Sequence, residues 1–199
     1  NFIMNNNNIK YIDNFLFNNE KNTMLKWLKS NEFKKGINND NSIIKRKQLW
    51  FQKEKKPFNK EWEKFDRWCS DPEYNNLLIY LEFIILIYFK EHNININVNI
   101  NSCLINKYEN GSEFIKFHQD SQKAFGKNHF IILYSIGEER TMQFKHINNK
   151  LIDCGKTNHP SLDLDTYMKN TNNHWLMNHP TFCFRKKQIL WFIIWYWRF

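Results

Sequence analysis

One stretch of the chain decides its fold: Leu104-Ile105-Asn106-Lys107-Tyr108-Glu109-Asn110-Gly111-Ser112-Glu113-Phe114-Ile115-Lys116-Phe117-His118-Gln119-Asp120. On an extended strand, residues i and i+2 point to the same face. His118 and Asp120 therefore present an imidazole and a carboxylate side by side. One further histidine from a distant segment would complete a face of two histidines and one carboxylate. Such a face leaves three positions of an octahedral Fe(II) ion open.

Length and composition predict one globular domain, residues 1–199. The chain has 199 residues, 42% of them hydrophobic, which is enough for one sizeable core. The four cysteines are scattered without a Cys-x-x-Cys pair, which argues against a zinc ribbon and against a disulfide scaffold. With no visible signal peptide, we expect an intracellular protein of the nucleus or cytoplasm that is not secreted.

Charge and hydropathy indicate the partners. The net charge of +9 favours an anionic partner, nucleic acid first. The apolar run Leu77–Phe89 is shorter than the roughly 20 residues that a membrane span needs, and Glu82 interrupts it. We therefore expect a buried helix packed against a sheet, no membrane partner, and a monomer.

The order of elements favours an α+β fold or a helix-buttressed β-sandwich, because helices come first and a run of short strands follows. Helices are predicted at Asn18–Leu28 and from Pro72 or Glu73 to about Glu91, and a loop over Lys29–Asn41. The predicted strands are Lys10–Phe17 (a short strand and turn), Ser42–Gln52, Asn97–Tyr108, Glu113–His118, His129–Ser135, Arg140–His146, Lys150–Cys154, Asp163–Met168 and Ile189–Trp197.

Further motifs accompany the opening stretch. They are Leu104-Ile105-Asn106-x-Tyr108-x-x-Gly111, Ile131 to Gly137 followed by Arg140, Phe144-Lys145-His146, Arg46-Lys47-Gln48, His174-Trp175 and Arg185-Lys186-Lys187. With His118-Gln119-Asp120 they resemble the AlkB family of Fe(II)/2-oxoglutarate-dependent dioxygenases over nearly the whole chain. The resemblance implies a double-stranded β-helix (jelly roll) with N-terminal helices buttressing one sheet. It also implies oxidative dealkylation of N-alkylated bases in nucleic acid, a DNA repair activity.

By this resemblance, His118 and Asp120 bind Fe(II), while Asn106 and Tyr108 hydrogen-bond 2-oxoglutarate. The family's second histidine follows a Trp-like residue, and here Met177 holds the expected place after Trp175. His179 is preferred as the third ligand, because it precedes Arg185-Lys186-Lys187 at about the family spacing. His174 is the alternative.

The C-terminus departs from the family, which ends in Arg-x-Asn-x-Thr-x-Arg with arginines that pair with 2-oxoglutarate. Arg198 stands at the last arginine, but Phe192 and Ile194 replace the first arginine and the asparagine. Arg185 or a lysine would have to supply the missing cation, or the site is impaired.

The resemblance assigns nucleic-acid binding to Arg46, Lys47 and Gln48. Three nearby aromatic residues are candidates to stack on a flipped base, with core packing as the alternative for at least one of them; they are Trp50, Phe51 and Phe58. Ser121 and Gln122 replace the acidic residue that follows His-x-Asp in the repair enzymes, so base selectivity is expected to differ. Two other functions stay open: a catalytically impaired AlkB-like nucleic-acid-binding protein, and a sister dioxygenase with a non-nucleic-acid substrate.

Overall fold

The computed structural model describes residues 9–12, 15–37, 41–53, 74–93, 100–118, 131–137, 140–146, 151–157, 161–165, 175–179 and 190–197. The helices in these ranges are α1 (Asn18–Ser30) and α3 (Asn76–Glu91). The strands are β1 (Ile9–Ile12), β2 (Lys34–Ile37), β3 (Ile43–Gln52), β4 (Ile100–Tyr108), β5 (Ile115–His118), β6 (Ile131–Gly137), β7 (Arg140–His146), β8 (Leu151–Thr157), β9 (Ser161–Asp165), β10 (Trp175–His179) and β11 (Leu190–Trp197). For β7 to β11, and for β5 from residue 116, the description is of the backbone alone.

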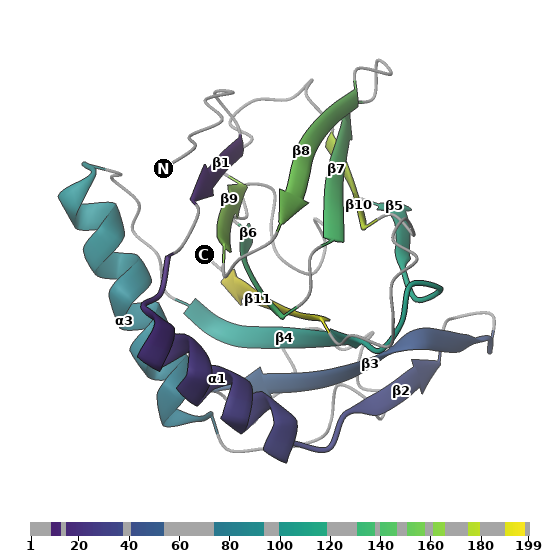
Figure 1. Cartoon of the computed structure of the whole chain (residues 1–199), viewed down its shortest axis with the longest axis horizontal. Coiled ribbons are helices and arrows are strands. Elements are labelled where there is room, and N and C mark those ends of the chain that lie inside the picture. Colours follow the sequence, from purple (N-terminus) through teal and green to yellow (C-terminus); the bar gives the residue numbers. More distant parts are fainter. Residues whose placement is uncertain are drawn as a thin grey trace.

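The strands form two antiparallel sheets (Figure 1). The large sheet has seven strands in the order β1-β9-β6-β11-β4-β3-β2, and the small sheet has four in the order β5-β10-β7-β8. From β4 onward the chain passes repeatedly between the sheets, so β4, β6, β9 and β11 belong to the large one. This path places β11, from the end of the chain, between β4 and β6.

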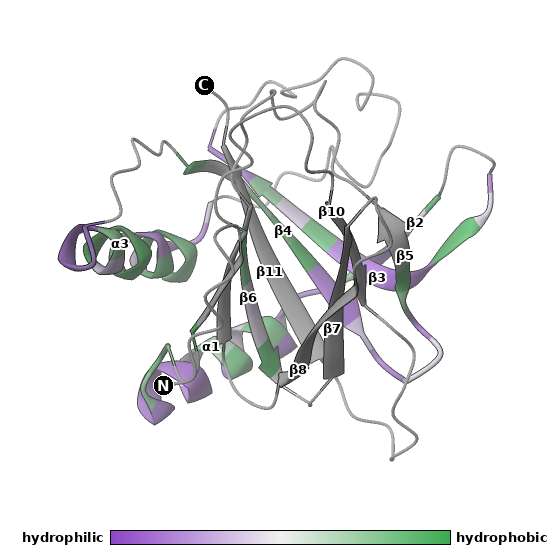
Figure 2. Ribbon diagram, turned by 90° about the horizontal axis from the view of Figure 1, so that it is seen from above, coloured by the Kyte–Doolittle hydropathy of each residue, from purple (hydrophilic) through white to green (hydrophobic). Residues whose placement is uncertain are grey.

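The two helices share one hydrophobic core with the large sheet. α3 contributes Leu78, Leu81, Ile85 and Phe89, whose spacing of three or four residues forms a single apolar stripe. Apart from Ile100, which lies next to a register irregularity, the sheet residues of this core alternate along their strands. They are Leu49, Phe51, Ile100, Cys103, Ile105, Ile132, Tyr134 and Ile136. Figures 1 and 2 show the helices on one side of the large sheet and the small sheet on the other. Residues between the core positions, such as Asn106, therefore belong to the face away from the helices.

The predicted helix is present and begins a few residues later than expected. It is buried on one face only, because the large apolar residues of its other face are exposed: Ile79, Tyr80, Phe83, Leu86 and Ile87. Its N-cap is Asn75, whose side chain accepts a hydrogen bond from the backbone nitrogen of Leu77 at 2.8 Å. Glu82 is buried and accepts hydrogen bonds from Lys53 Nζ, at 2.6 Å, and from the hydroxyl of Tyr74. Burial raises the pKa of Glu82 above its ordinary value, and the bonds from Lys53 and Tyr74 act in the opposite direction. None of the helices in the described ranges is long and apolar enough to cross a membrane.

Two strands were not predicted from the sequence. β2 lies where a loop was expected. Its sequence Lys34-Lys35-Gly36-Ile37 is polar, which suits an edge strand that pairs with β3 on one side only. β10 also lacked a strand signal, since Asn178 and His179 interrupt its apolar pattern. It nevertheless occupies the position between β5 and β7.

Candidate functional site

Asn106 and Tyr108 lie on the same face of β4, opposite the helix-side core. Both side chains are fully buried, with 0% exposure. Their neighbours Cys103 and Ile105 belong to the helix-side core, so the alternation of the strand directs Asn106 and Tyr108 toward the small sheet. This face of β4 is the floor of the candidate site.

Two donors from β3 hold the amide of Asn106. Arg46 Nε donates to Asn106 Oδ1 at 2.7 Å, and Gln48 Nε2 donates to the same oxygen at 2.8 Å. Because Oδ1 accepts both bonds, the orientation of the amide is fixed and its Nδ2 group remains as a donor. Gln48 is paired directly with Asn106 in the β3–β4 register, which explains why its amide reaches this oxygen.

This buried cluster has unused hydrogen-bonding capacity. Within the described residues, neither Asn106 Nδ2 nor Gln48 Oε1 has a hydrogen-bond partner. A buried polar group without a partner costs about 1–3 kcal/mol, so native structures seldom leave one unsatisfied. An anionic oxygen ligand such as the carboxylate of 2-oxoglutarate would accept the free amide hydrogen of Asn106, and these residues fit that cosubstrate.

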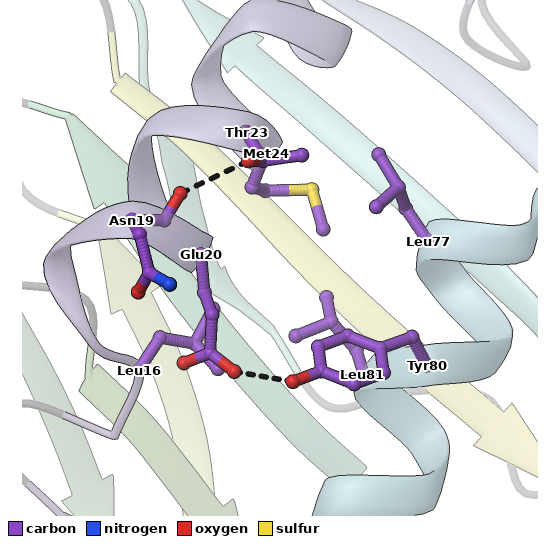
Figure 3. Close-up of a pocket in the computed structure, with 8 residues that line it drawn as sticks. All are labelled: Leu16, Asn19, Glu20, Thr23, Met24, Leu77, Tyr80 and Leu81. Atoms are coloured by element: carbon purple, nitrogen blue, oxygen red, sulfur yellow. Dashed lines mark hydrogen bonds between the residues drawn. The ribbon is translucent and has the colours of Figure 1, made fainter.

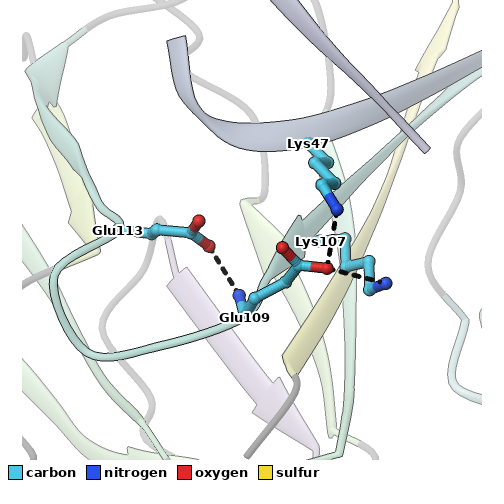
Figure 4. Close-up of polar contacts among 4 residues, drawn as sticks. All are labelled: Lys47, Lys107, Glu109 and Glu113. Atoms are coloured by element: carbon cyan, nitrogen blue, oxygen red, sulfur yellow. Dashed lines mark hydrogen bonds and ion pairs between the residues drawn. The ribbon is translucent and has the colours of Figure 1, made fainter. Parts of the chain in front are cut away.

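Residues 109–114 join β4 of the large sheet to β5 of the small one. Figure 4 shows the polar contacts of Glu109 and Glu113 in this connection. Glu113 accepts a hydrogen bond from the backbone nitrogen of Glu109 at 2.5 Å. Glu109 also forms ion pairs with Lys47 at 2.9 Å and Lys107 at 3.0 Å. The hydrogen bonds from Lys47 and then from Lys107 hold the pKa of Glu109 below its ordinary value. The connection thereby fixes the start of the strand that ends at His118.

The two predicted histidine ligands lie on neighbouring strands of the small sheet. β5 ends at His118, and β10 pairs with it in an antiparallel register. Met177 is the direct partner of His118, whereas His179 is paired with Ile115 after an irregularity in the register. The fold thus brings His179 to the strand beside His118, with Met177 in the position directly opposite it. Asp120, His174 and Arg198 lie outside the described residues.

The register of β11 places an apolar position beside the Asn106 cluster. Phe192 is paired with Asn106 on β4 and with Ser135 on β6. The sequence of β11, Leu190-Trp191-Phe192-Ile193-Ile194-Trp195-Tyr196-Trp197, contains no charged residue. No cation therefore comes from this strand at the point where the resembling family has its first arginine.

Trp50 and Phe51, predicted as a platform for a base, are both 1% exposed. Phe51 belongs to the helix-side core and contacts Trp27, with ring centroids 5.7 Å apart. Trp50 lies on the other face, where its Nε1 donates to Gln52 Oε1 at 3.0 Å. Because both rings are buried, neither offers a face to a base, as the alternative of core packing predicts. Phe58 lies outside the described residues.

A separate small pocket of about 190 Å³ lies between α1 and α3 (Figure 3). Glu20 accepts a hydrogen bond from the hydroxyl of Tyr80 across it, and this bond raises the pKa of Tyr80. The pocket is on the helix side of the large sheet, away from Asn106. It is therefore distinct from the candidate active site.

Comparisons with known proteins give the family and the fold of the chain. A family model described as the 2OG-Fe(II) oxygenase superfamily matches residues 8–180, and no curated protein matches the sequence. A prolyl hydroxylase from Trichoplax adhaerens, solved with a hypoxia inducible factor peptide fragment, is similar at 14% identity and a TM-score of 0.62. The alignment covers 98% of this chain and 85% of that one.

Two further structures are similar in fold. OsALKBH1 has 11% identity and a TM-score of 0.63, covering 96% of this chain and 98% of that one. A Pseudomonas putida prolyl-4-hydroxylase has 11% identity and a TM-score of 0.57, covering 96% and 93%. At these identities the likeness is one of fold alone. Because the family model spans most of its length, the chain belongs to the 2OG-Fe(II) oxygenase superfamily, whose enzymes are dioxygenases that use Fe(II) and 2-oxoglutarate.

Proposed function

We propose that this oxygenase removes alkyl groups from N-alkylated bases in nucleic acid, acting as a monomer in the nucleus or cytoplasm. The observation that carries the proposal is a basic hairpin beside the candidate site. In the described parts of β2 and β3, Lys34, Lys35 and Lys45 are exposed cations, and there is no carboxylate. Such a surface attracts a phosphate backbone.

We further propose that strands β4 to β11 form the double-stranded β-helix of the superfamily, with α1 and α3 buttressing the large sheet. The alternation of these strands between the two sheets supports this assignment. In this frame His118, Asp120 and His179 hold Fe(II), and Asn106, Tyr108 and Arg198 hold 2-oxoglutarate. Asn106 lies on β4 and His118 lies on β5, the next strand along the chain. The proposed metal and cosubstrate residues therefore come from consecutive strands.

The bound iron and 2-oxoglutarate would supply the oxidant that hydroxylates the N-linked carbon, which then leaves as an aldehyde. The chain positions this chemistry. Asn106 donates its free amide hydrogen to the cosubstrate, while Gln48 keeps the amide in that orientation. Because Asn106 and Tyr108 are fully buried, the cosubstrate would be held away from bulk water.

The exposed lysines of the hairpin would hold the substrate rather than react with it. The logarithm of the binding constant falls linearly with the logarithm of the salt concentration, and each phosphate contact that is lost should make this slope shallower by about one. Replacing Lys34 and Lys35 by glutamine should therefore weaken oligonucleotide binding and flatten its dependence on salt. Turnover of 2-oxoglutarate without nucleic acid should not change.

The test is release of formaldehyde from an oligonucleotide that contains 1-methyladenine, with Fe(II), ascorbate and 2-oxoglutarate. The proposal predicts release by the full chain and none by His118→Ala. A proline-containing peptide serves as the competing substrate. Hydroxylation of the peptide without formaldehyde release would show a sister dioxygenase. Salt-sensitive DNA binding without any 2-oxoglutarate turnover would show an impaired nucleic-acid-binding protein.

A further inference from the structure

The guanidinium of Arg46 lies next to the residues that are proposed to bind 2-oxoglutarate. Arg46 and Gln48 are two residues apart on β3 and share a face, and both donate to Asn106 Oδ1. Continuing the β3–β4 register by one residue from the Lys47–Lys107 pair brings Arg46 beside Tyr108. Arg46 therefore belongs to the buried polar cluster and not to the exposed surface of the hairpin.

Among the residues that the structure describes, none balances the charge of Arg46. Within the described ranges, no carboxylate forms an ion pair with Arg46, and Nε is the nitrogen that has a hydrogen-bond partner. Lys47, the next residue, differs in both respects, because it lies on the other face and pairs with Glu109. A partly buried cation without a counter-charge favours an anionic ligand.

The resembling family has a cation on the strand that corresponds to β11, and this chain lacks it. β11 lies on the opposite side of Asn106 from β3, the strand of Arg46. In the large sheet Asn106 lies between Gln48 on β3 and Phe192 on β11. 2-Oxoglutarate carries two carboxylates, and a buried carboxylate needs charged donors. β11 offers none over Leu190–Trp197, whereas β3 offers the planar fork of Arg46 from the other side of Asn106.

We propose that Arg46 pairs with the distal carboxylate of 2-oxoglutarate, supplying from β3 the cation that β11 lacks. This inference rests on the proposed assignment of Asn106 and Tyr108 to the cosubstrate. It assigns Arg46 to cosubstrate selection and removes it from the residues that meet phosphates of nucleic acid.

The test compares two ligands that differ only at the distal carboxylate, 2-oxoglutarate and 2-oxopentanoate. Their affinities for the full chain are measured by calorimetry with Mn(II) replacing Fe(II), so that no turnover occurs. Arg46→Gln should weaken 2-oxoglutarate by roughly tenfold to a hundredfold, the loss expected for a charged hydrogen bond. Binding of 2-oxopentanoate should be unchanged, which also shows that the variant is folded. Arg46→Lys should restore part of the preference.

Lys45→Gln is the matched control. It removes the same charge from the neighbouring position of β3, where Lys45 is exposed and lies 5.7 Å from the ring centre of Phe114. Because the assay contains no nucleic acid, the proposed phosphate contact of Lys45 plays no part in it, and the variant should leave both affinities unchanged. Equal weakening of both ligands by Arg46→Gln, no weakening of either, or a selective loss in Arg198→Gln alone would overturn the assignment. Failure of the unmodified chain to bind 2-oxoglutarate would instead reject the proposed cosubstrate site.

Discussion

Replacing Asn106 by aspartate should separate the two roles of this side chain. Asn106 Oδ1 accepts hydrogen bonds from Arg46 and Gln48, whereas Nδ2 has no partner in the described residues. Aspartate keeps the acceptor and gains an ion pair with Arg46, which offsets the cost of burying its charge. The free energy of unfolding should therefore stay within about 1 kcal/mol of the unmodified protein. Asn106→Ala removes the acceptor and should cost about 2–4 kcal/mol, because two donors lose their partner.

Asn106→Asp should weaken cosubstrate binding, although it should leave stability nearly unchanged. Asn106→Asp replaces a donor by a carboxylate that repels 2-oxoglutarate, and a hydrogen bond to a charged group is worth about 1.5–3 kcal/mol. The Kd for 2-oxoglutarate should rise by roughly tenfold to a hundredfold. Urea denaturation measures the stability of both variants, and calorimetry with Mn(II) measures the affinity. Unchanged affinity in Asn106→Asp, or destabilisation equal to that of Asn106→Ala, would refute the assignment of the two atoms.

Three further predictions concern the fold. Leu78→Ala should lower the free energy of unfolding by about 2–5 kcal/mol, because Leu78 is fully buried under the sheet; urea denaturation checks this, with the exposed Ile79→Ala as a control that should change it by less than about 0.5 kcal/mol. Lys53→Met should lower the free energy of unfolding by about 1–2 kcal/mol at neutral pH, because it leaves the buried carboxylate of Glu82 without its cation. The expected loss is modest because Lys53 is itself partly exposed. Because burial raises the pKa of Glu82, that cost should disappear in acid, where Glu82 is protonated; a cost independent of pH would contradict the pairing. The pKa of Glu109 is lowered, so its ionised carboxylate stabilises the fold above the ordinary glutamate pKa, and this contribution is lost as the pH falls through the lowered value. Glu109→Gln should therefore reduce the loss of stability in acid, which circular dichroism measures.

The main helices and most of the strands were predictable from the sequence. The apolar run Leu77–Phe89 was predicted as a helix and Asn97–Tyr108 as a strand, and the structure has α3 and β4 there. β2 and β10 were not predictable, because an edge strand and a strand of the small sheet need no long apolar pattern. Their strand character depends on pairing with neighbours that are distant in sequence.

The candidate site could be predicted only as a set of residue types. The spacing of Asn106 and Tyr108 predicted a shared face, and both residues lie on the face away from the helices. Which side chains reach that face from β3 was not evident, because Arg46-Lys47-Gln48 reads as one basic segment. The strand alternation divides it, directing Arg46 and Gln48 to Asn106 and Lys47 to Glu109. The same alternation places Phe51 in the helix-side core.

The third iron ligand shows where sequence spacing and sheet register differ. Spacing from the basic triplet favours His179, and the register places His179 on the strand beside His118 but gives Met177 the position directly opposite. A bulge shifts side chains relative to their partners, so counting residues along the chain does not fix which one reaches a metal.

Anaerobic titration with Fe(II) and 2-oxoglutarate tests the central claim most directly, through the charge-transfer absorption that appears when the cosubstrate chelates the bound iron. We predict this band in the unmodified chain and in His174→Ala, and its loss in His118→Ala, Asp120→Ala and His179→Ala. Absence of the band in the unmodified chain, or its persistence in His118→Ala and Asp120→Ala, would contradict an iron and 2-oxoglutarate centre at this site.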